Sequence, residues 1–108
     1  LGFEIKSEKE LEDRGLRVVM VDTGNTIIEL LTGTRPDSAV SRFIEKRGPG
    51  IHHLCFEVDD IEAALSELSE KGMRLIDEEP KIGAEGNPVA FLHPGSTGKV
   101  LIEIEQTG

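Results

Sequence analysis

The order of elements predicted for residues 51–108 narrows the folds that this chain can adopt. Residues 51–58 alternate their side chains with the period of two that is typical of a strand. Leu54, Phe56 and Val58 share one face, which is predicted to pack on the helix that follows. Apolar residues between Ile61 and Leu68 then recur at helical spacing, and Lys71-Gly72 is typical of a helix C-terminus. Three further strands are predicted, at 74–76, 88–93 and 99–105. The order is therefore strand, helix, strand, strand, strand.

The start of this helix is predicted at Asp59, because Glu62 follows three residues later as in a capping box. A second helix is predicted to begin at Asp37 or Ser38 and to end near Gly48. Both assignments rest on side chains that accept hydrogen bonds from the first free N–H groups of a helix.

The first part of the chain, residues 1–49, predicts a short strand at 3–7, a charged loop at 8–14 and a hairpin of strands 16–22 and 26–32. The linking helix follows. If a strand and a helix preceded Leu1, the chain would hold two copies of one βαβββ unit. Because the sequence does not begin with Met, we expect such an upstream segment to be absent from it.

Composition excludes several classes of protein. The 108 residues fit one domain, and 37% hydrophobic content is ordinary for a folded chain. A net charge of −9 repels nucleic acid. It suits a cation site, and it is equally compatible with a role in solubility alone. The single cysteine, Cys55, indicates a reducing compartment. We therefore expect a protein without nucleic-acid or membrane partners, since no apolar run approaches the roughly 20 residues that span a bilayer.

Three predicted strands each carry one ionisable side chain between apolar neighbours: Glu29, His53 and Glu103. A buried carboxylate is costly unless it is paired or bound to a metal. Imidazole and carboxylate ligands suit borderline divalent ions such as Zn, Co, Mn or Ni. For each residue taken alone a solvated sheet face is favoured, whereas their occurrence on three separate strands favours a metal site, so the pattern leaves both interpretations open.

Three other side chains receive structural interpretations. Alternation places His52 on the opposite face from His53, so His52 is predicted to be a partly buried structural residue. His93 precedes Pro94 at a strand end, where a role in the turn is favoured over contact with a substrate. Cys55 shares the face of His53 but has no CxxC partner, which favours a small core residue over a ligand.

The residues from Gly50 to Ile61, Gly-Ile-His-His-Leu-Cys-Phe-Glu-Val-Asp-Asp-Ile, resemble the central segment of methylmalonyl-CoA epimerases. Further segments resemble the same family, at residues 77–84, 91–94, 98–103 and 25–31. The resemblance therefore covers essentially the whole chain. It implies the vicinal oxygen chelate fold, an α+β architecture of paired βαβββ modules that form a cupped sheet. Residues 1–108 would then be one domain, with a partial first module and linking helix at 1–49 and a complete second module at 50–108.

The resemblance also implies a site. Glu29, His53 and Glu103 match the family's metal ligands, with cobalt favoured, and Glu103 is also a candidate base. A further family ligand, a histidine, would lie upstream of Leu1. Some epimerases carry a glutamate base at the position of Val18, so the second base stays open. Arg47 or Lys81 could hold the coenzyme A phosphates, although solvent-facing roles are favoured for both.

The implied activity is interconversion of (R)- and (S)-methylmalonyl-CoA by metal-assisted removal of the proton next to the thioester. An acyl-CoA substrate, a homodimer and a cytoplasmic location, or the mitochondrial matrix in a eukaryote, follow from the same resemblance. The alternatives are a glyoxalase I-like isomerase or dioxygenase of the superfamily, and a non-catalytic small-molecule binding module. One matching histidine with two glutamates favours redox-inert chemistry over an iron dioxygenase.

Overall fold

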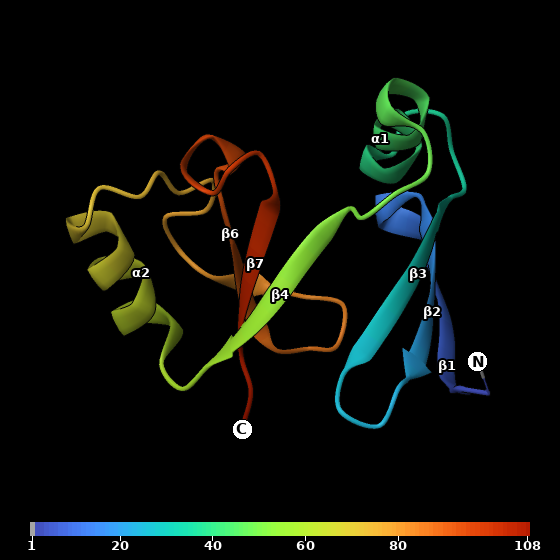
Figure 1. Ribbon diagram of the computed structural model, residues 1–108, viewed down its shortest axis with the longest axis horizontal. Coiled ribbons are helices and arrows are strands. Elements are labelled where there is room, and N and C mark those ends of the chain that lie inside the picture. Colours follow the sequence, from blue (N-terminus) through green and yellow to red (C-terminus); the bar gives the residue numbers. More distant parts are fainter. Residues whose placement is uncertain (1) are drawn as a thin grey trace. The chain divides into compact units, whose positions relative to one another are not determined.

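The computed structural model describes residues 2–108 and has α+β architecture (Figure 1). The chain divides into two compact units, Leu1–Gly50 and Ile51–Gly108. Each unit contains one sheet and one α-helix. Within residues 2–108, neither helix is long and apolar enough to cross a bilayer.

The sheet of the first unit is antiparallel, in the order β1-β2-β3. Its strands are β1 (Glu4–Leu11), β2 (Leu16–Asp22) and β3 (Ile27–Gly33), with a 3-10 helix at Glu12–Arg14. The prediction of a loop at residues 8–14 is wrong for residues 8–11, which belong to β1. Glu8 and Lys9 pair with β2, because backbone hydrogen bonds along the ladder stabilise a strand whose charged side chains stay in solvent.

Helix α1 (Ala39–Arg47) follows the sheet, and its N-cap is Ser38, one of the two predicted residues. The Ser38 hydroxyl oxygen accepts a hydrogen bond from the Ser41 N–H at 3.1 Å. Gly33 allows the end of β3 to approach this helix start, because a Cβ at Gly33 would overlap the Ser41 side chain. The close approach therefore depends on a residue without a side chain.

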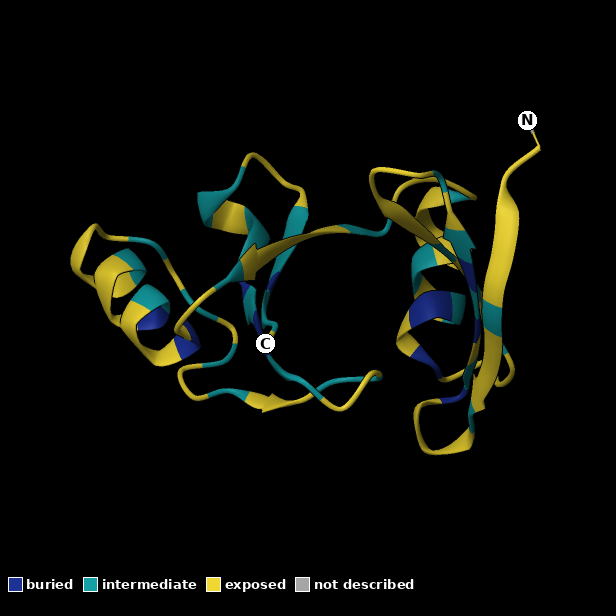
Figure 2. Cartoon of the chain, turned by 90° about the horizontal axis from the view of Figure 1, so that it is seen from below, coloured by how far each residue is buried: buried dark blue, intermediate teal, exposed yellow. Residues whose placement is uncertain are grey.

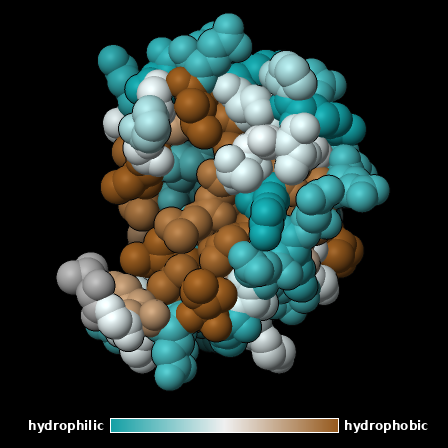
Figure 3. Space-filling view, turned by 90° about the vertical axis from the view of Figure 1, so that its right-hand side faces the viewer, coloured by the Kyte–Doolittle hydropathy of each residue, from teal (hydrophilic) through white to brown (hydrophobic). Residues whose placement is uncertain are grey.

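One side of the first sheet is apolar and exposed. Ile5, Val21 and Ile28 lie in register across its three strands. Ile5 is 67% exposed and Leu30 is 56% exposed. Apolar side chains gather on the face of the molecule that Figure 3 shows. This side of the first sheet is therefore apolar surface that the helix of its own unit does not cover.

The second unit has the predicted sequence of one strand, one helix and three strands, but its third element lies at Lys81–Ile82, within a segment predicted as a loop, and not at 74–76. Its elements are β4 (His53–Val58), α2 (Ile61–Glu70), β5 (Lys81–Ile82), β6 (Pro88–Leu92), a 3-10 helix at Pro94–Ser96, and β7 (Leu101–Gln106). The strand order is β4-β7-β6-β5. Strand β4 pairs in parallel with β7, the last strand of the chain, while the other pairs are antiparallel.

Helix α2 packs on one face of this sheet through a small apolar core made by Ile61, Leu65, Ala90 and Ile104. All four are buried, and Figure 2 shows buried positions of α2 on the side turned toward its sheet. The prediction that Leu54 and Phe56 also pack beneath the helix is wrong, since they are 46% and 55% exposed. They lie on β4, an edge strand, whereas α2 contacts β6 and β7.

Two other predictions for this unit need correction. The N-cap of α2 is Asp60 rather than Asp59, and its carboxylate accepts the Ala63 N–H at 3.1 Å. Residues 74–76 do not form a strand, because Leu75 makes only an isolated bridge to Leu92. In both cases tertiary contacts select among local alternatives that the sequence pattern leaves close in energy.

Candidate functional site

His53 and Glu103 meet on the face of the second sheet that α2 does not cover. His53 opens β4, and Glu103 lies at mid-strand in β7, opposite Cys55. The His53 Nε2 atom is 3.0 Å from the Glu103 Oε1 atom. Their side chains are 13% and 15% exposed. An imidazole and a carboxylate that are largely withdrawn from water therefore point to a common place, as two ligands of one ion would.

Phe91 adjoins this pair. It lies opposite Glu103 in the β6–β7 register. Its ring makes an edge-to-face contact with the His53 ring at a centroid distance of 5.7 Å. Such aromatic contacts favour a fixed relative orientation of the two rings. Phe91 therefore restrains the direction in which the His53 imidazole presents its nitrogen atoms.

Alternation predicted that His52 lies on the opposite face from His53, and this prediction is wrong. The His52 Nδ1 atom is 3.0 Å from Nδ1 of His53, and the two rings are nearly perpendicular. The reason is that β4 begins at His53, so the strand alternation does not extend to His52. Burial lowers the pKa of His52 below its usual value, and the charge of His53 lowers it further.

Two polar contacts extend along the same sheet face. Asn87 donates to Glu105 Oε2 at 3.1 Å, and the Cys55 thiol is 4.0 Å from Glu105 Oε1. Cys55 is exposed, so its prediction as a core residue is wrong. The sheet face that alternation assigned to Cys55 is open, which explains the difference. Sequence reasoning missed Glu105 and Asn87, since no local pattern pairs a loop amide with a strand carboxylate.

Glu29 belongs to the other unit. It lies in β3 opposite Met20, and it is half-buried. The second unit by itself thus brings together two of the three predicted ligands, His53 and Glu103. Within residues 2–108, no group of three or more His, Cys, Asp or Glu side chains that could hold a metal ion is found.

The remaining candidates have local roles. His93 Nδ1 accepts the Gly95 N–H at 2.9 Å, which agrees with the predicted role in the turn. Arg47 lies at the end of α1, where its guanidinium stands 5.8 Å from the centre of the Phe43 ring. Lys81 opens β5 and contacts Asp77 and Phe91. Of the two cations, Lys81 is therefore the one connected to the His53–Glu103 pair within the second unit.

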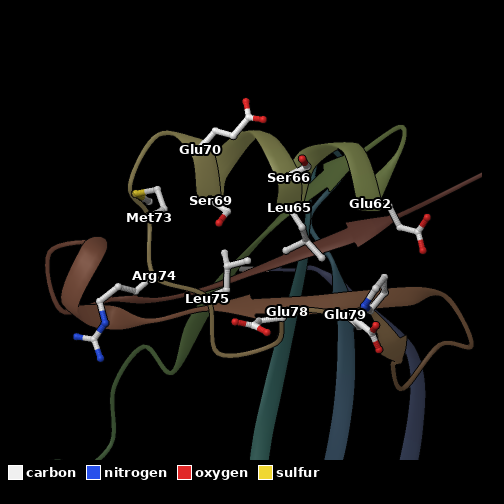
Figure 4. A pocket seen from close by; sticks show the side chains of 11 residues that line it. Glu62, Leu65, Ser66, Ser69, Glu70, Met73, Arg74, Leu75, Glu78 and Glu79 are labelled. Carbon is white, nitrogen blue, oxygen red and sulfur yellow. The ribbon is translucent and has the colours of Figure 1, made fainter.

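A cleft of about 680 Å³ lies on the helix side of the second unit (Figure 4). Leu65 of α2 and Leu75 face each other across it. Its lining includes one arginine, Arg74, and four glutamates: Glu62, Glu70, Glu78 and Glu79. The His53–Glu103 pair is not part of this cleft, and the excess of carboxylates there opposes binding of an anionic ligand.

The matching family model is that of the glyoxalase/bleomycin resistance protein/dioxygenase superfamily, over residues 1–91. The chain belongs to this superfamily, and methylmalonyl-CoA epimerases are among its relatives within it. Members of the superfamily and of the epimerase family depend in general on a divalent metal ion.

Two relatives show the extent of the similarity. The mitochondrial methylmalonyl-CoA epimerase of Bos taurus is 47% identical over 107 residues, which are 98% of this chain and 61% of the relative. This chain thus spans less than two thirds of that relative's length. The ethylmalonyl-CoA/methylmalonyl-CoA epimerase of Cereibacter sphaeroides is 44% identical over 108 residues, which are 98% of this chain and 81% of the relative.

Among solved structures, a methylmalonyl-CoA epimerase in complex with methylmalonyl-CoA and NH4+ matches with a TM-score of 0.86 and 34% identity. The match covers 99% of this chain and 78% of that chain. The predicted α+β fold of the vicinal oxygen chelate type and the predicted family are therefore confirmed.

Proposed function

We propose that this protein is a methylmalonyl-CoA epimerase. The observation that carries the proposal is the 3.0 Å approach of His53 and Glu103 on the open face of the second sheet. A carboxylate in that position suits removal of a weakly acidic proton next to a thioester. The names of the relatives and the acyl-CoA in the similar solved structure support the substrate class.

The donor atoms of the pair fit a divalent ion. One imidazole nitrogen and one carboxylate oxygen already point to one place, and both side chains are too shielded to be well hydrated. We propose Glu29 as a third ligand and cobalt as the metal. A bound divalent ion would supply Lewis-acid stabilisation of the negative charge that develops on the substrate.

Glu103 is the proposed base. Its carboxylate takes the proton from the α-carbon, the C–H bond breaks, and the electron pair moves toward the thioester oxygen to give an enolate. A second acid returns a proton to the opposite face, which inverts the centre. Phe91 restrains the His53 ring, which lies beside the Glu103 carboxylate.

We further propose that residues 1–49 and 50–108 correspond to two modules of one domain, the second of them a complete βαβββ module. The β4-α2-β5-β6-β7 order and the antiparallel β1-β2-β3 sheet support this division. A homodimer and a cytoplasmic location, or the mitochondrial matrix in a eukaryote, are part of the same proposal. The mitochondrial names of animal relatives support the second location.

The test measures exchange of the α-proton of methylmalonyl-CoA in deuterated water. The protein is first treated with a chelator and is then assayed with and without added Co²⁺. Mass spectrometry of the substrate gives its deuterium content. We expect rapid deuterium incorporation and loss of optical purity only with the metal. The hemithioacetal of glutathione and methylglyoxal serves as the competing substrate. Its turnover without any exchange on methylmalonyl-CoA would replace the epimerase by a glyoxalase I-like isomerase.

A further inference from the structure

Lys81 is a cation whose position is restrained by two contacts at the edge of the second sheet. Its Nζ atom is 3.5 Å from Asp77 Oδ2. The same atom lies 5.1 Å from the centre of the Phe91 ring. An ammonium group over an aromatic face is attracted by the ring quadrupole. The two contacts together limit where the long side chain of Lys81 can place its charge.

Asp77 is itself firmly positioned. Its Oδ2 atom accepts the Phe91 N–H at 2.9 Å, and its own N–H donates to the Phe91 carbonyl oxygen at 3.3 Å. The Asp77 side chain is only 18% exposed. A carboxylate bound to the backbone of β6 cannot follow a mobile lysine. Asp77 therefore fixes Lys81 relative to Phe91.

Phe91 links Lys81 to the candidate site. The Phe91 ring contacts the His53 ring and lies in register with Glu103. One aromatic ring thus separates the Lys81 ammonium from His53. The Lys81 side chain remains 51% exposed, and an ammonium group has three N–H donors. Lys81 can therefore bind a further anion without leaving Asp77 or Phe91.

We propose that Lys81 binds an anionic group of the acyl-CoA substrate, either the carboxylate of the acyl part or a phosphate of coenzyme A. This inference rests on the proposed function and specifies how that site recognises its substrate. A chain with a net charge of −9 repels a polyanion, so recognition of an anionic group needs a cation beside the site. The cleft under α2, with four glutamates and one arginine, does not suit an anion.

Lys71 provides a matched control within the same unit. It also pairs with a carboxylate four residues earlier, Glu67, at 3.0 Å. That pair is exposed on both sides, at 67% and 65%, and it lies at the end of α2. Replacing Lys71 removes the same charge and a similar ion pair, but from a place without contact to Phe91 or His53. A general charge effect would appear in both variants.

The experiment compares Lys81→Met, Lys81→Arg and Lys71→Met. Steady-state KM and kcat are measured with methylmalonyl-CoA and with methylmalonyl-pantetheine, which lacks the nucleotide phosphates. Calorimetry gives the Kd of propionyl-CoA, which lacks the carboxylate. Circular dichroism melting confirms that the variants fold. We expect Lys81→Met to raise the KM for methylmalonyl-CoA about tenfold with little change in kcat, and Lys81→Arg to restore most of it.

The ligand series identifies the anion. If Lys81 binds a phosphate, Lys81→Met weakens propionyl-CoA binding and leaves the pantetheine substrate unaffected. If it binds the carboxylate, both methylmalonyl esters lose equally and propionyl-CoA binding does not change. Equal effects of Lys81→Met and Lys71→Met on every ligand overturn the inference. The proposed function is refuted separately if the wild-type protein does not exchange the α-proton. In that case the propionyl-CoA titration and its Lys71 control still decide whether Lys81 binds a phosphate.

Discussion

The two faces of the second sheet differ although they are built from alternate residues of the same strands. On the helix side, Ala90 and Ile104 pack against Ile61 and Leu65, with none of the four more than 4% exposed. On the open side, His53 and Glu103 keep 13% and 15% exposure. Complete burial suits methylene groups, whereas charged groups retain contact with water or need a partner. One face thus stabilises the unit and the other is free for chemistry.

The largest expected effect distinguishes a carboxylate of the open face that takes part in the reaction from one that does not. Glu103→Gln keeps the shape of the side chain but removes the basic oxygen. We expect the rate of α-proton exchange to fall about 10²- to 10⁴-fold. Deuterium incorporation measured by mass spectrometry gives this rate, and metal analysis of the purified variant separates loss of the base from loss of a ligand.

The control is Glu57→Gln, which makes the same chemical change on the same face of β4, where Glu57 is exposed. This variant should exchange the proton at the wild-type rate. Wild-type exchange by Glu103→Gln would remove Glu103 from the role of base and leave the proposed mechanism without its central group.

The next largest expected effect is a loss of stability when the apolar core on the helix side of the second sheet is changed. Leu65→Ala removes a 4% exposed side chain from the core, and we expect the free energy of unfolding to fall by about 2–5 kcal/mol. Denaturant titration at constant pH measures this change. Ser66→Ala, at an exposed neighbouring position of α2, should cost nothing, since Ala favours helix. Similar losses in the two variants would contradict the core described here.

A third prediction concerns metal binding on the open face. Excess Co²⁺ should stabilise the chelator-treated protein, by about 2.7 kcal/mol at a hundredfold excess over the dissociation constant. His53→Ala should lose this stabilisation, because it removes one of the three proposed ligands. The control is His93→Ala, in which the lost nitrogen caps a 3-10 helix and the metal-induced shift should persist. Melting with and without metal gives both shifts, and equal shifts in all three proteins would exclude His53 as a ligand.

The smallest expected change in the free energy of unfolding concerns the N-terminal cap of α2, the helix that covers one face of the second sheet. Asp60→Ala removes the acceptor of the Ala63 N–H and should cost about 1 kcal/mol of unfolding free energy. Asp59→Ala, one residue earlier, should be nearly neutral. The start of α2 is also tied to β7, because the Ile61 N–H donates to Gln106 Oε1 at 2.9 Å. A greater loss for Asp59→Ala would show that the helix begins earlier than described.

Some of the fold could be predicted because its signals are local. The strand at Leu16–Asp22 and the helix that starts after Ser38 match their predicted positions, since periodicity and capping act within a few residues. The exposure of Leu54 and Phe56 could not be predicted. Alternation assigns side chains to a face, but it does not tell whether a helix covers that part of the face.

The candidate site shows the same division. Glu29, His53 and Glu103 each interrupt an apolar strand, which predicts that they are ligands, and these roles stay a prediction. The contacts of Lys81 with Asp77 and Phe91 lie within fifteen residues along the chain, yet no sequence pattern marks them. They arise because the loop before β5 returns to the edge of β6.

The sequence by itself determined the alternation of side chains within the strands, the start of α1 at Asp37 or Ser38, and the excess of negative charge. Only the tertiary structure decided that β7 lies between β4 and β6, which makes His53 and Glu103 neighbours although fifty residues separate them. The physical reason is that the period of a strand follows from local backbone geometry, whereas the choice of its neighbours depends on the packing of the whole unit.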